Sequence, residues 1–142
     1  MKIIEADSEN NSALKTFKLV EWPEADKEHY GDHLPDFTKH AGTLIAEESG
    51  EIQGYISYSA VAGVGKIESI IVGKKFRGRG VAKRLLETVE QKMKTVGVHK
   101  VMLETGANWQ AKKVYEKQGY QVRVVLPDDC GHQDFVLMDK MI

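Results

Sequence analysis

The clearest hydrophobic periodicity of the chain lies between residues 81 and 97. Apolar side chains recur there every three or four residues, at Ala82, Leu85, Leu86, Val89, Met93 and Val96. Charged residues such as Lys83, Arg84, Glu87 and Lys94 fill the positions between them. This spacing predicts an amphipathic helix that packs one face on a sheet, and Gly97 is the expected end of that helix.

Runs of β-branched and other apolar residues predict strands on both sides of this helix. The expected strands are residues 1–6, 43–48, 52–58, 67–72, 98–105, 120–126 and 133–141. The turn Ser49-Gly50-Glu51 predicts a hairpin between the second and third of them, with a bulge at Gly54. Further helices are expected from near Ala13, in a short piece within residues 21–40, and over residues 108–118.

Length and composition narrow the class of protein. A chain of 142 residues with 42% hydrophobic and 29% charged residues is most simply one domain, spanning residues 1–142. The net charge of -1 gives no general attraction to nucleic acid or membranes. The single cysteine, Cys130, excludes an intrachain disulfide and a thiolate zinc site, so we expect no metal. No signal-peptide or membrane-spanning apolar run is present, and a cytoplasmic location is expected.

A basic, glycine-rich turn precedes the periodic helix. Its sequence is Arg77-Gly78-Arg79-Gly80-Val81-Ala82. Glycines allow a close approach to the backbone, and the free amide groups and dipole of a helix N-terminus attract anions. The turn therefore predicts a pyrophosphate site, the alternative being a tight turn with solvated basic residues.

Spacing separates the known phosphate-binding patterns. A P-loop requires Lys-Ser or Lys-Thr after its last glycine, whereas Val81-Ala82 follows Gly80. A dinucleotide fingerprint requires a third glycine where Lys83 stands. The turn fits Arg-x-x-Gly-x-Ala instead, and a second block follows it, Asn108-Trp109-Gln110-Ala111 with Tyr115 and Gly119-Tyr120.

These two blocks, in this order, resemble the GNAT superfamily of acetyl-CoA-dependent N-acyltransferases. The resemblance is strongest over residues 66–122. It implies an α/β (mixed α+β) fold, with a twisted, mixed but mostly antiparallel sheet of about six to seven strands and helices on both faces. It also implies acetyl-CoA as the cofactor, bound between the strands that end at Val72 and Thr105.

The resemblance assigns residues to the cofactor. Backbone groups near Ile70 and Val72 would pair with the pantetheine arm, and the amides from Arg79 through Gly80 and Val81 to Ala82 would hold the pyrophosphate, with Arg77 and Lys83 adding charge. Asn108 would contact the cofactor. The segment before Asn108 is shorter than the family pattern, so an N-cap role is the alternative for this residue.

Tyr115 is the expected general acid. In the family pattern it approaches the thioester sulfur, and a phenol with an ordinary pKa of about 10 keeps its proton at neutral pH. The alternative is a half-buried tyrosine that only packs through its ring.

Glu68 is the first candidate for the base that deprotonates the amine. Strand alternation puts it on one face with Ile70 and Val72, where aliphatic surroundings would raise the pKa of the carboxyl. The alternative is an ion pair of Glu68 with Lys66 or Lys100. His132 with Asp134 is the second candidate group.

The acceptor side is the least defined. By family analogy Trp22, Tyr30, His29 and His33 would line it. The sequence predicts transfer of an acetyl group to a primary amine by direct attack in a ternary complex, with a small-molecule acceptor and a possible homodimer. A protein or peptide amine as acceptor, and a non-catalytic acyl-CoA sensor, remain alternatives.

Overall fold

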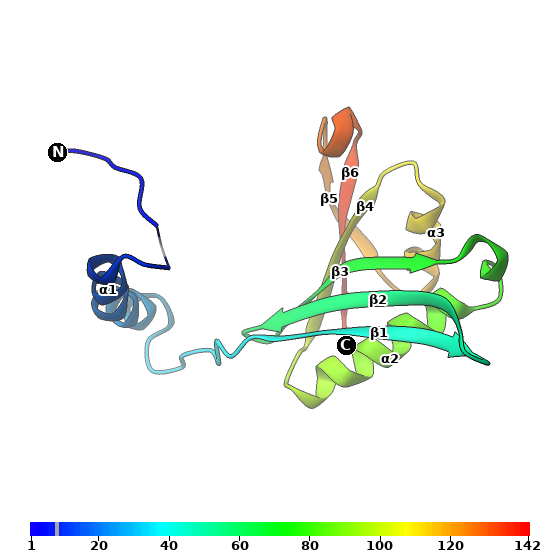
Figure 1. Ribbon diagram of the computed structural model, residues 1–142, viewed down its shortest axis with the longest axis horizontal. Helices are drawn as coiled ribbons and strands as arrows, with labels where there is room; N and C mark the ends of the chain where they lie inside the picture. Colours follow the sequence, from blue (N-terminus) through cyan, green and yellow to red (C-terminus); the bar gives the residue numbers. More distant parts are fainter. Residues whose placement is uncertain (8) are drawn as a thin grey trace. The chain divides into compact units, whose positions relative to one another are not determined.

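The computed structural model describes residues 1–7 and 9–142. The chain forms two compact units, Met1–Pro35 and Asp36–Ile142, and each is described by itself. Figure 1 labels the elements of both units.

The unit Met1–Pro35 consists of one helix, α1 (Ser12–Tyr30), and its flanks. The side chain of Asn11 caps it by accepting a hydrogen bond from the Leu14 amide at 2.9 Å. The predicted second short helix is wrong, because α1 continues through Pro23 to Tyr30. Good helix formers on both sides of Pro23 outweigh the loss of one amide donor. The strand predicted over residues 1–6 is also wrong, since this segment pairs with no described strand.

The unit Asp36–Ile142 is built on a six-stranded sheet in the order β1-β2-β3-β4-β6-β5. The strands are β1 (His40–Glu48), β2 (Glu51–Val61), β3 (Val64–Val72), β4 (Lys100–Gly106), β5 (Gln121–Leu126) and β6 (Phe135–Met141). All neighbours are antiparallel except β3 and β4. The predicted mixed, mostly antiparallel sheet is therefore confirmed.

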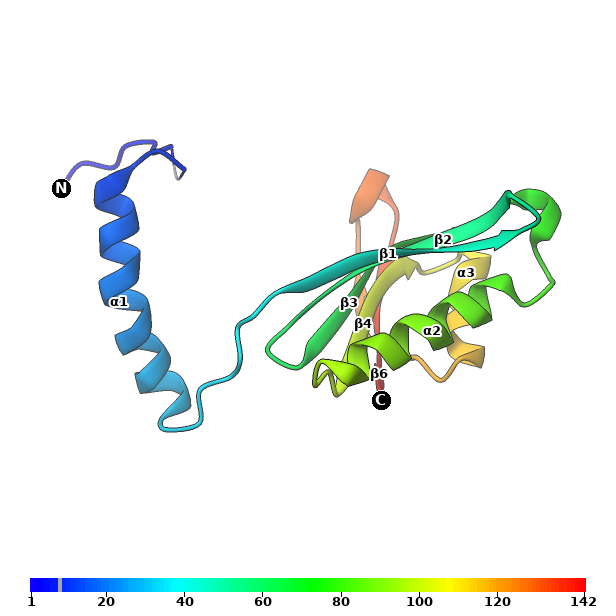
Figure 2. The same ribbon diagram turned by 60° about the horizontal axis from the view of Figure 1, so that its bottom comes forward.

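Two helices, α2 (Val81–Thr95) and α3 (Gln110–Lys117), share one hydrophobic core with the sheet. α2 packs against β1, β2 and β3, as Figure 2 shows, and α3 packs against β4. The buried face of α2 carries Leu85, Leu86, Val89 and Met93, as its periodicity predicts. Gly97, with φ +80°, follows the C-cap of α2. The core thus lies between the helices and one face of the sheet.

β3 and β4 separate soon after they begin. Their parallel pairing covers only Val64–Lys66 against Lys100–Met102. From Ile67 to Val72 the edge of β3 that faces β4 has no strand partner among the described residues. Figure 1 shows the two strands running apart toward their carboxyl ends. This divergence opens the sheet at its middle, where the site is found.

Two bulges modify the hairpin strands. The β1–β2 turn has positive φ at Ser49 and Gly50, as two-residue hairpin turns require, and the predicted bulge lies directly before Gly54. The second bulge is in β3, where Ser57 pairs with Ser69 but Tyr58 pairs with Ile67. Glu68 is the additional residue, and a bulge of this kind turns a side chain to a different face.

Two smaller elements complete the unit, the 3-10 turns η1 (Lys74–Phe76) and η2 (Cys130–His132). Among residues 1–7 and 9–142, no helix combines the length and apolar character needed to cross a membrane.

Candidate active site

The glycine turn presents an open helix N-terminus. Gly78 and Gly80 both adopt positive φ, +74° and +81°, which explains glycine at these positions. The first α-helical bond of α2 runs from the Arg84 amide to the Gly80 carbonyl at 3.0 Å. The amide groups of the three preceding residues, 81–83, have no acceptor four residues back within the helix. They are free to bind an anion, a role that the sequence predicts for the amides from Arg79 to Ala82.

A pocket of about 560 Å³ begins at this turn and runs along the free edge of β3. Its walls come from the end of β3, the turn, the start of α2 and one side of α3. The lining residues are Ile70, Ile71, Val72, Phe76, Arg77, Gly78, Gly80, Val81, Ala82, Lys83, Gln110, Ala111, Val114 and Tyr115. The pocket combines free amides and two cations at one end with aliphatic walls along its length.

Most residues assigned to the cofactor from the sequence lie in this pocket, but Arg79 and Asn108 do not. The guanidinium of Arg79 lies over the ring of Phe76, 5.9 Å from its centre. Asn108 is exposed before α3, and the N-cap of that helix is Trp109, so the alternative N-cap role of Asn108 is wrong. Ile71, Gln110 and Val114 were missed, because only the divergence of β3 and β4 places them together.

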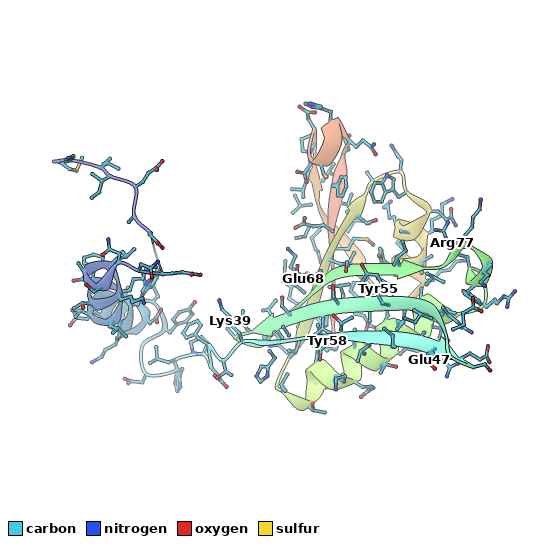
Figure 3. All side chains as sticks on the ribbon, viewed as in Figure 1. Lys39, Glu47, Tyr55, Tyr58, Glu68 and Arg77 are labelled. Carbon is cyan, nitrogen blue, oxygen red and sulfur yellow. The ribbon has the colours of Figure 1, made fainter. Side chains whose placement is uncertain are left out.

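The side chain of Arg77 is held by the end of β3. Its Nε donates a hydrogen bond to the Val72 carbonyl oxygen at 3.1 Å. Figure 3 shows Arg77 beyond the carboxyl end of β3. The contact orients the guanidinium beside the pocket, while the Val72 carbonyl keeps a second lone pair. Lys75, by contrast, pairs with Glu51, the first residue of β2.

Tyr115 lies on α3 with only 7% of its surface exposed, and it lines the pocket. Burial raises the pKa of its phenol above the ordinary value. The hydroxyl makes no hydrogen bond to another described residue, whereas the ring packs edge-on against Tyr120 at 6.1 Å. A phenol in this setting is neutral at physiological pH and has a proton to donate.

Tyr115 packs against the ring of Tyr120, which is itself held by hydrogen bonds. The Tyr120 hydroxyl donates to Glu90 Oε1 at 3.0 Å, and Lys140 donates to Glu90 Oε2 at 2.7 Å. Burial, followed by the neighbouring Glu90 carboxylate, raises the pKa of Tyr120. This hydrogen-bonded group connects α2, β6 and the residue before β5.

Glu68 does not share a face with Ile70 and Val72, so that prediction is wrong. The bulge turns Glu68 to the face opposite the helices, where Ser59 Oγ donates to its Oε1 at 2.5 Å. Lys66 Nζ lies 3.8 Å from the other carboxylate oxygen, and the Glu68 side chain is 43% exposed. Among the described residues, Glu68 contacts a hydroxyl and an ammonium group instead of the predicted aliphatic surroundings, and the alternative ion pair with Lys66 is present.

Hydroxyl groups surround Glu68 on that face. Ser57 Oγ and Ser69 Oγ are 2.6 Å apart, and Ser69 Oγ donates to Tyr55 Oη at 3.4 Å. Figure 3 shows Tyr55 and Glu68 on the neighbouring strands β2 and β3. No pattern in the sequence marks Tyr55 and the two serines as one group.

The His132 candidate lies in the β5–β6 connection. Its Nδ1 is 3.0 Å from Asp128 Oδ1, and 92% of its side chain is exposed. Asp134, expected beside it, instead accepts a hydrogen bond from the Asp128 amide. Neither residue lines the pocket. Trp22 and His33 belong to the unit Met1–Pro35, so their placement at the site remains a prediction.

Trp109 links the start of α3 to the β5–β6 connection. Its indole donates to Gln133 Oε1 at 3.1 Å and meets the ring of Phe135 edge-on at 5.2 Å. The ring lies directly on Gly106, where any Cβ would be 2.5 Å from it. This packing explains the glycine at the end of β4.

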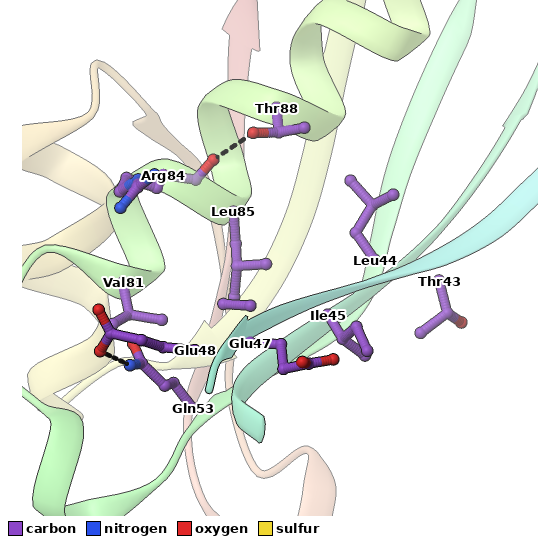
Figure 4. A pocket seen from close by; sticks show the side chains of 11 residues that line it. Thr43, Leu44, Ile45, Glu47, Glu48, Gln53, Val81, Arg84, Leu85 and Thr88 are labelled. Carbon is purple, nitrogen blue, oxygen red and sulfur yellow. Dashed lines mark hydrogen bonds between the residues drawn. The ribbon is translucent and has the colours of Figure 1, made fainter. Parts of the chain in front are cut away.

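A second, larger groove of about 700 Å³ lies between the β1–β2 hairpin and α2 (Figure 4). Its polar residues include Glu48 and Gln53, which bond each other at 2.8 Å, and Arg84. The lining of this groove shares Val81 with the glycine turn but includes neither Arg77 nor Lys83 nor a tyrosine, so the smaller pocket is the better candidate. In the described part of the chain, no group of three histidine, cysteine or acidic side chains is placed to hold a metal.

A family model and similar known proteins all point to acetyltransferases. The model of the acetyltransferase (GNAT) family matches residues 8–120. An IAA acetyltransferase of Azospirillum brasilense is 33% identical over 84 residues, covering 56% of this chain and 54% of the relative. An uncharacterized N-acetyltransferase of Methanocaldococcus jannaschii is 35% identical over 100 residues, covering 68% and 64%. The chain thus spans between half and two thirds of the length of these two relatives.

The fold also matches solved structures. The crystal structure of an acetyltransferase from Bacillus cereus superposes with a TM-score of 0.75 at 19% identity, covering 99% of this chain and 98% of the other. At this identity the match supports the fold alone.

Proposed function

The chain belongs to the acetyltransferase (GNAT) family, and on that basis we propose that it transfers the acetyl group of acetyl-CoA to a primary amine. The observation that carries the proposal is the pocket along the free edge of β3. It joins an anion-binding helix N-terminus to a buried, neutral tyrosine.

The donor set of the pocket fits acetyl-CoA. The amides at residues 81–83, with Arg77 and Lys83, suit a pyrophosphate because a helix N-terminus and nearby cations both favour anionic oxygens. The aliphatic walls, including Ile70 and Val114, suit an uncharged arm. Unpaired backbone groups of β3 are free to bond the amides of such an arm. When bound, acetyl-CoA supplies an acetyl group activated as a thioester.

Tyr115 is proposed as the general acid. Tyr115 lines the pocket, and its hydroxyl keeps its proton at neutral pH because burial raises the pKa of the phenol. Tyr115 would give this proton to the thiolate that leaves as the amide bond forms. The edge-on contact with Tyr120 holds the ring in place.

Glu68 is proposed as the base, acting through water. A primary amine has an ordinary pKa near about 10.4, so a proton must be removed before nitrogen can attack. Glu68 is exposed just beyond the last paired residues of β3 and β4, on the face opposite the helices. The edge of β3 is free beyond this point. An amine that approaches from the Glu68 face could therefore reach, past this edge, acetyl-CoA bound in the pocket on the helix side. Direct attack in a ternary complex is consistent with this two-sided arrangement.

A thiol-release assay with a panel of amines tests the function. The panel should contain amino alcohols, amino sugars, polyamines and a peptide with a free amino group, with acetylation of the amine checked by mass spectrometry. We expect thiol release that depends on both acetyl-CoA and an amine. Acetyl-CoA binding without turnover on any amine would replace this proposal with a binding module.

A further inference from the structure

Resting on the proposed function, we propose that the hydroxyl-lined face of β2 and β3 is the acceptor site and that it selects primary amines carrying a hydroxyl group on the neighbouring carbon. The site consists of Tyr55, Ser57 and Ser59 on β2 and of Glu68 and Ser69 on β3. It lies on the sheet face opposite α2 and α3.

The β3 bulge creates this arrangement. Consecutive residues of a regular strand point to opposite faces, yet Glu68 and Ser69 both bond serines of β2. Glu68 is the additional residue, so the side chain of Ser69 follows it on the same face instead of on the opposite one. The bulge therefore places a carboxylate and a hydroxyl side by side on one surface, next to the free edge of β3.

The spacing of these two groups sets the acceptor chemistry. The partners of these groups, Ser57 and Ser59, lie two residues apart on β2, about 6.6 Å along the strand. An amino group and a hydroxyl on adjacent carbons can bridge such a distance when each makes a hydrogen bond. The Glu68 carboxylate would receive the amino group, and the Ser57–Ser69 pair would exchange hydrogen bonds with the acceptor hydroxyl. Serine hydroxyls both donate and accept, so they suit a neutral hydroxyl group better than a second ammonium.

The charge and exposure of the side chains on this face also suit a small amine that carries a hydroxyl group. Lys66 Nζ lies 3.8 Å from the Glu68 carboxylate. The site therefore contains one carboxylate and one nearby cation, and it is not strongly acidic. A compound with several ammonium groups would meet Lys66 unfavourably. Beside the hydroxyls, Ile45, Tyr55 and Ile71 form an exposed apolar row across three strands, which suits the carbon skeleton of the acceptor.

The test compares 2-aminoethanol with propylamine, in which a methyl group replaces the hydroxyl. We expect kcat/KM of the wild-type protein to be about tenfold higher for 2-aminoethanol, as one neutral hydrogen bond allows. In the double variant Ser57→Ala with Ser69→Ala this preference should fall to about one, because kcat/KM drops for 2-aminoethanol alone. The acetyl-CoA dissociation constant should be unchanged, and Thr95→Ala, which removes a hydroxyl at the end of α2, should retain the preference.

Three results would overturn the inference. They are equal kcat/KM for both amines in the wild type, a preference that survives in the double variant, and a double variant that loses both amines equally. Turnover without preference removes only the acceptor assignment, whereas absence of turnover with every amine removes the proposed function as well. Circular dichroism of the double variant establishes that it is folded.

Discussion

Glu68 and Ser69 are consecutive residues of β3, yet both side chains bond serines of β2 on the same face of the sheet. Regular strands do not allow this, so the bulge creates the surface proposed as the acceptor site. The proposed donor site lies along the edge of the same strand, where Ile70 and Val72 line the pocket. One strand thus separates the proposed binding sites of the two substrates.

Glu68→Gln tests the proposed base. Glutamine preserves the shape and the hydrogen bond from Ser59 but cannot accept a proton, so we expect kcat to fall about 100-fold. The acetyl-CoA dissociation constant, measured by calorimetry, should be unchanged. Glu104→Gln on β4 is the matched control and should retain activity. Full activity of Glu68→Gln would assign the proton to another acceptor.

Arg77 and Arg79 differ in a way that binding measurements can detect. Arg77 lines the pocket and is oriented by the Val72 carbonyl, whereas Arg79 packs on Phe76 outside it. We expect Arg77→Ala to raise the acetyl-CoA dissociation constant about tenfold, as loss of a charged hydrogen-bond donor predicts, and Arg79→Ala to change it little. The effect of Arg77→Ala should shrink at high salt. Equal effects of the two variants would show that the turn acts only through general charge.

The carboxylate of Asp139 makes a contribution to the free energy of unfolding that depends on pH. Arg123 Nε donates to its carboxylate at 2.6 Å and Lys100 Nζ lies at 3.3 Å, and these cations, Arg123 foremost, hold the pKa of Asp139 below its usual value. A carboxyl group with a lower pKa in the folded state stabilises the protein above its unfolded pKa. This contribution is lost as the pH falls through the folded pKa.

We therefore expect Asp139→Asn to lower the free energy of unfolding at pH 7. The difference from the wild type should shrink below about pH 4, where the wild-type carboxyl becomes protonated in the unfolded chain. Urea unfolding at a series of pH values measures this difference in the free energy of unfolding. Asp129→Asn, at an exposed position, is the control. A difference that stays constant down to the most acidic pH would contradict the ion-pair explanation.

Gly106→Ala should destabilise the protein through Trp109. The new Cβ would lie 2.5 Å from the indole, and overpacking of this kind costs about 2 kcal/mol. In a Trp109→Ala background the same substitution should cost much less, because the ring is no longer there. A double-mutant cycle of unfolding free energies measures this coupling. Additive effects of the two substitutions would mean that the ring does not cause the requirement for glycine.

The sequence predicted the elements whose signals are local. Periodicity located α2, and the glycines located its start because their positive φ values are a local requirement. The β1–β2 turn was equally visible in Ser49-Gly50. Most of the pocket followed from the two motif blocks, since each occupies one continuous segment.

Features that depend on strand pairing escaped prediction. A bulge is one additional residue relative to a partner strand, so Glu68 was assigned to the wrong face when β3 was taken as regular. The Ser57–Ser69 contact joins residues twelve positions apart and has no sequence signature. The strand expected over residues 1–6 failed for a similar reason, because apolar residues such as Ile3 and Ile4 do not show whether a partner strand exists.

Tyr115→Phe tests the central claim most directly, because it removes one hydroxyl from the pocket and preserves the buried ring. Thiol release and acetyl-CoA affinity should be measured side by side from pH 6 to about pH 9.5, with Tyr58→Phe as the control. We predict an acetyl-CoA dissociation constant like that of the wild type and a kcat lower by about 100-fold. The wild type should lose no activity through Tyr115 over this range, because the raised pKa of the phenol keeps it protonated. A Tyr115→Phe variant with wild-type kcat would contradict the account.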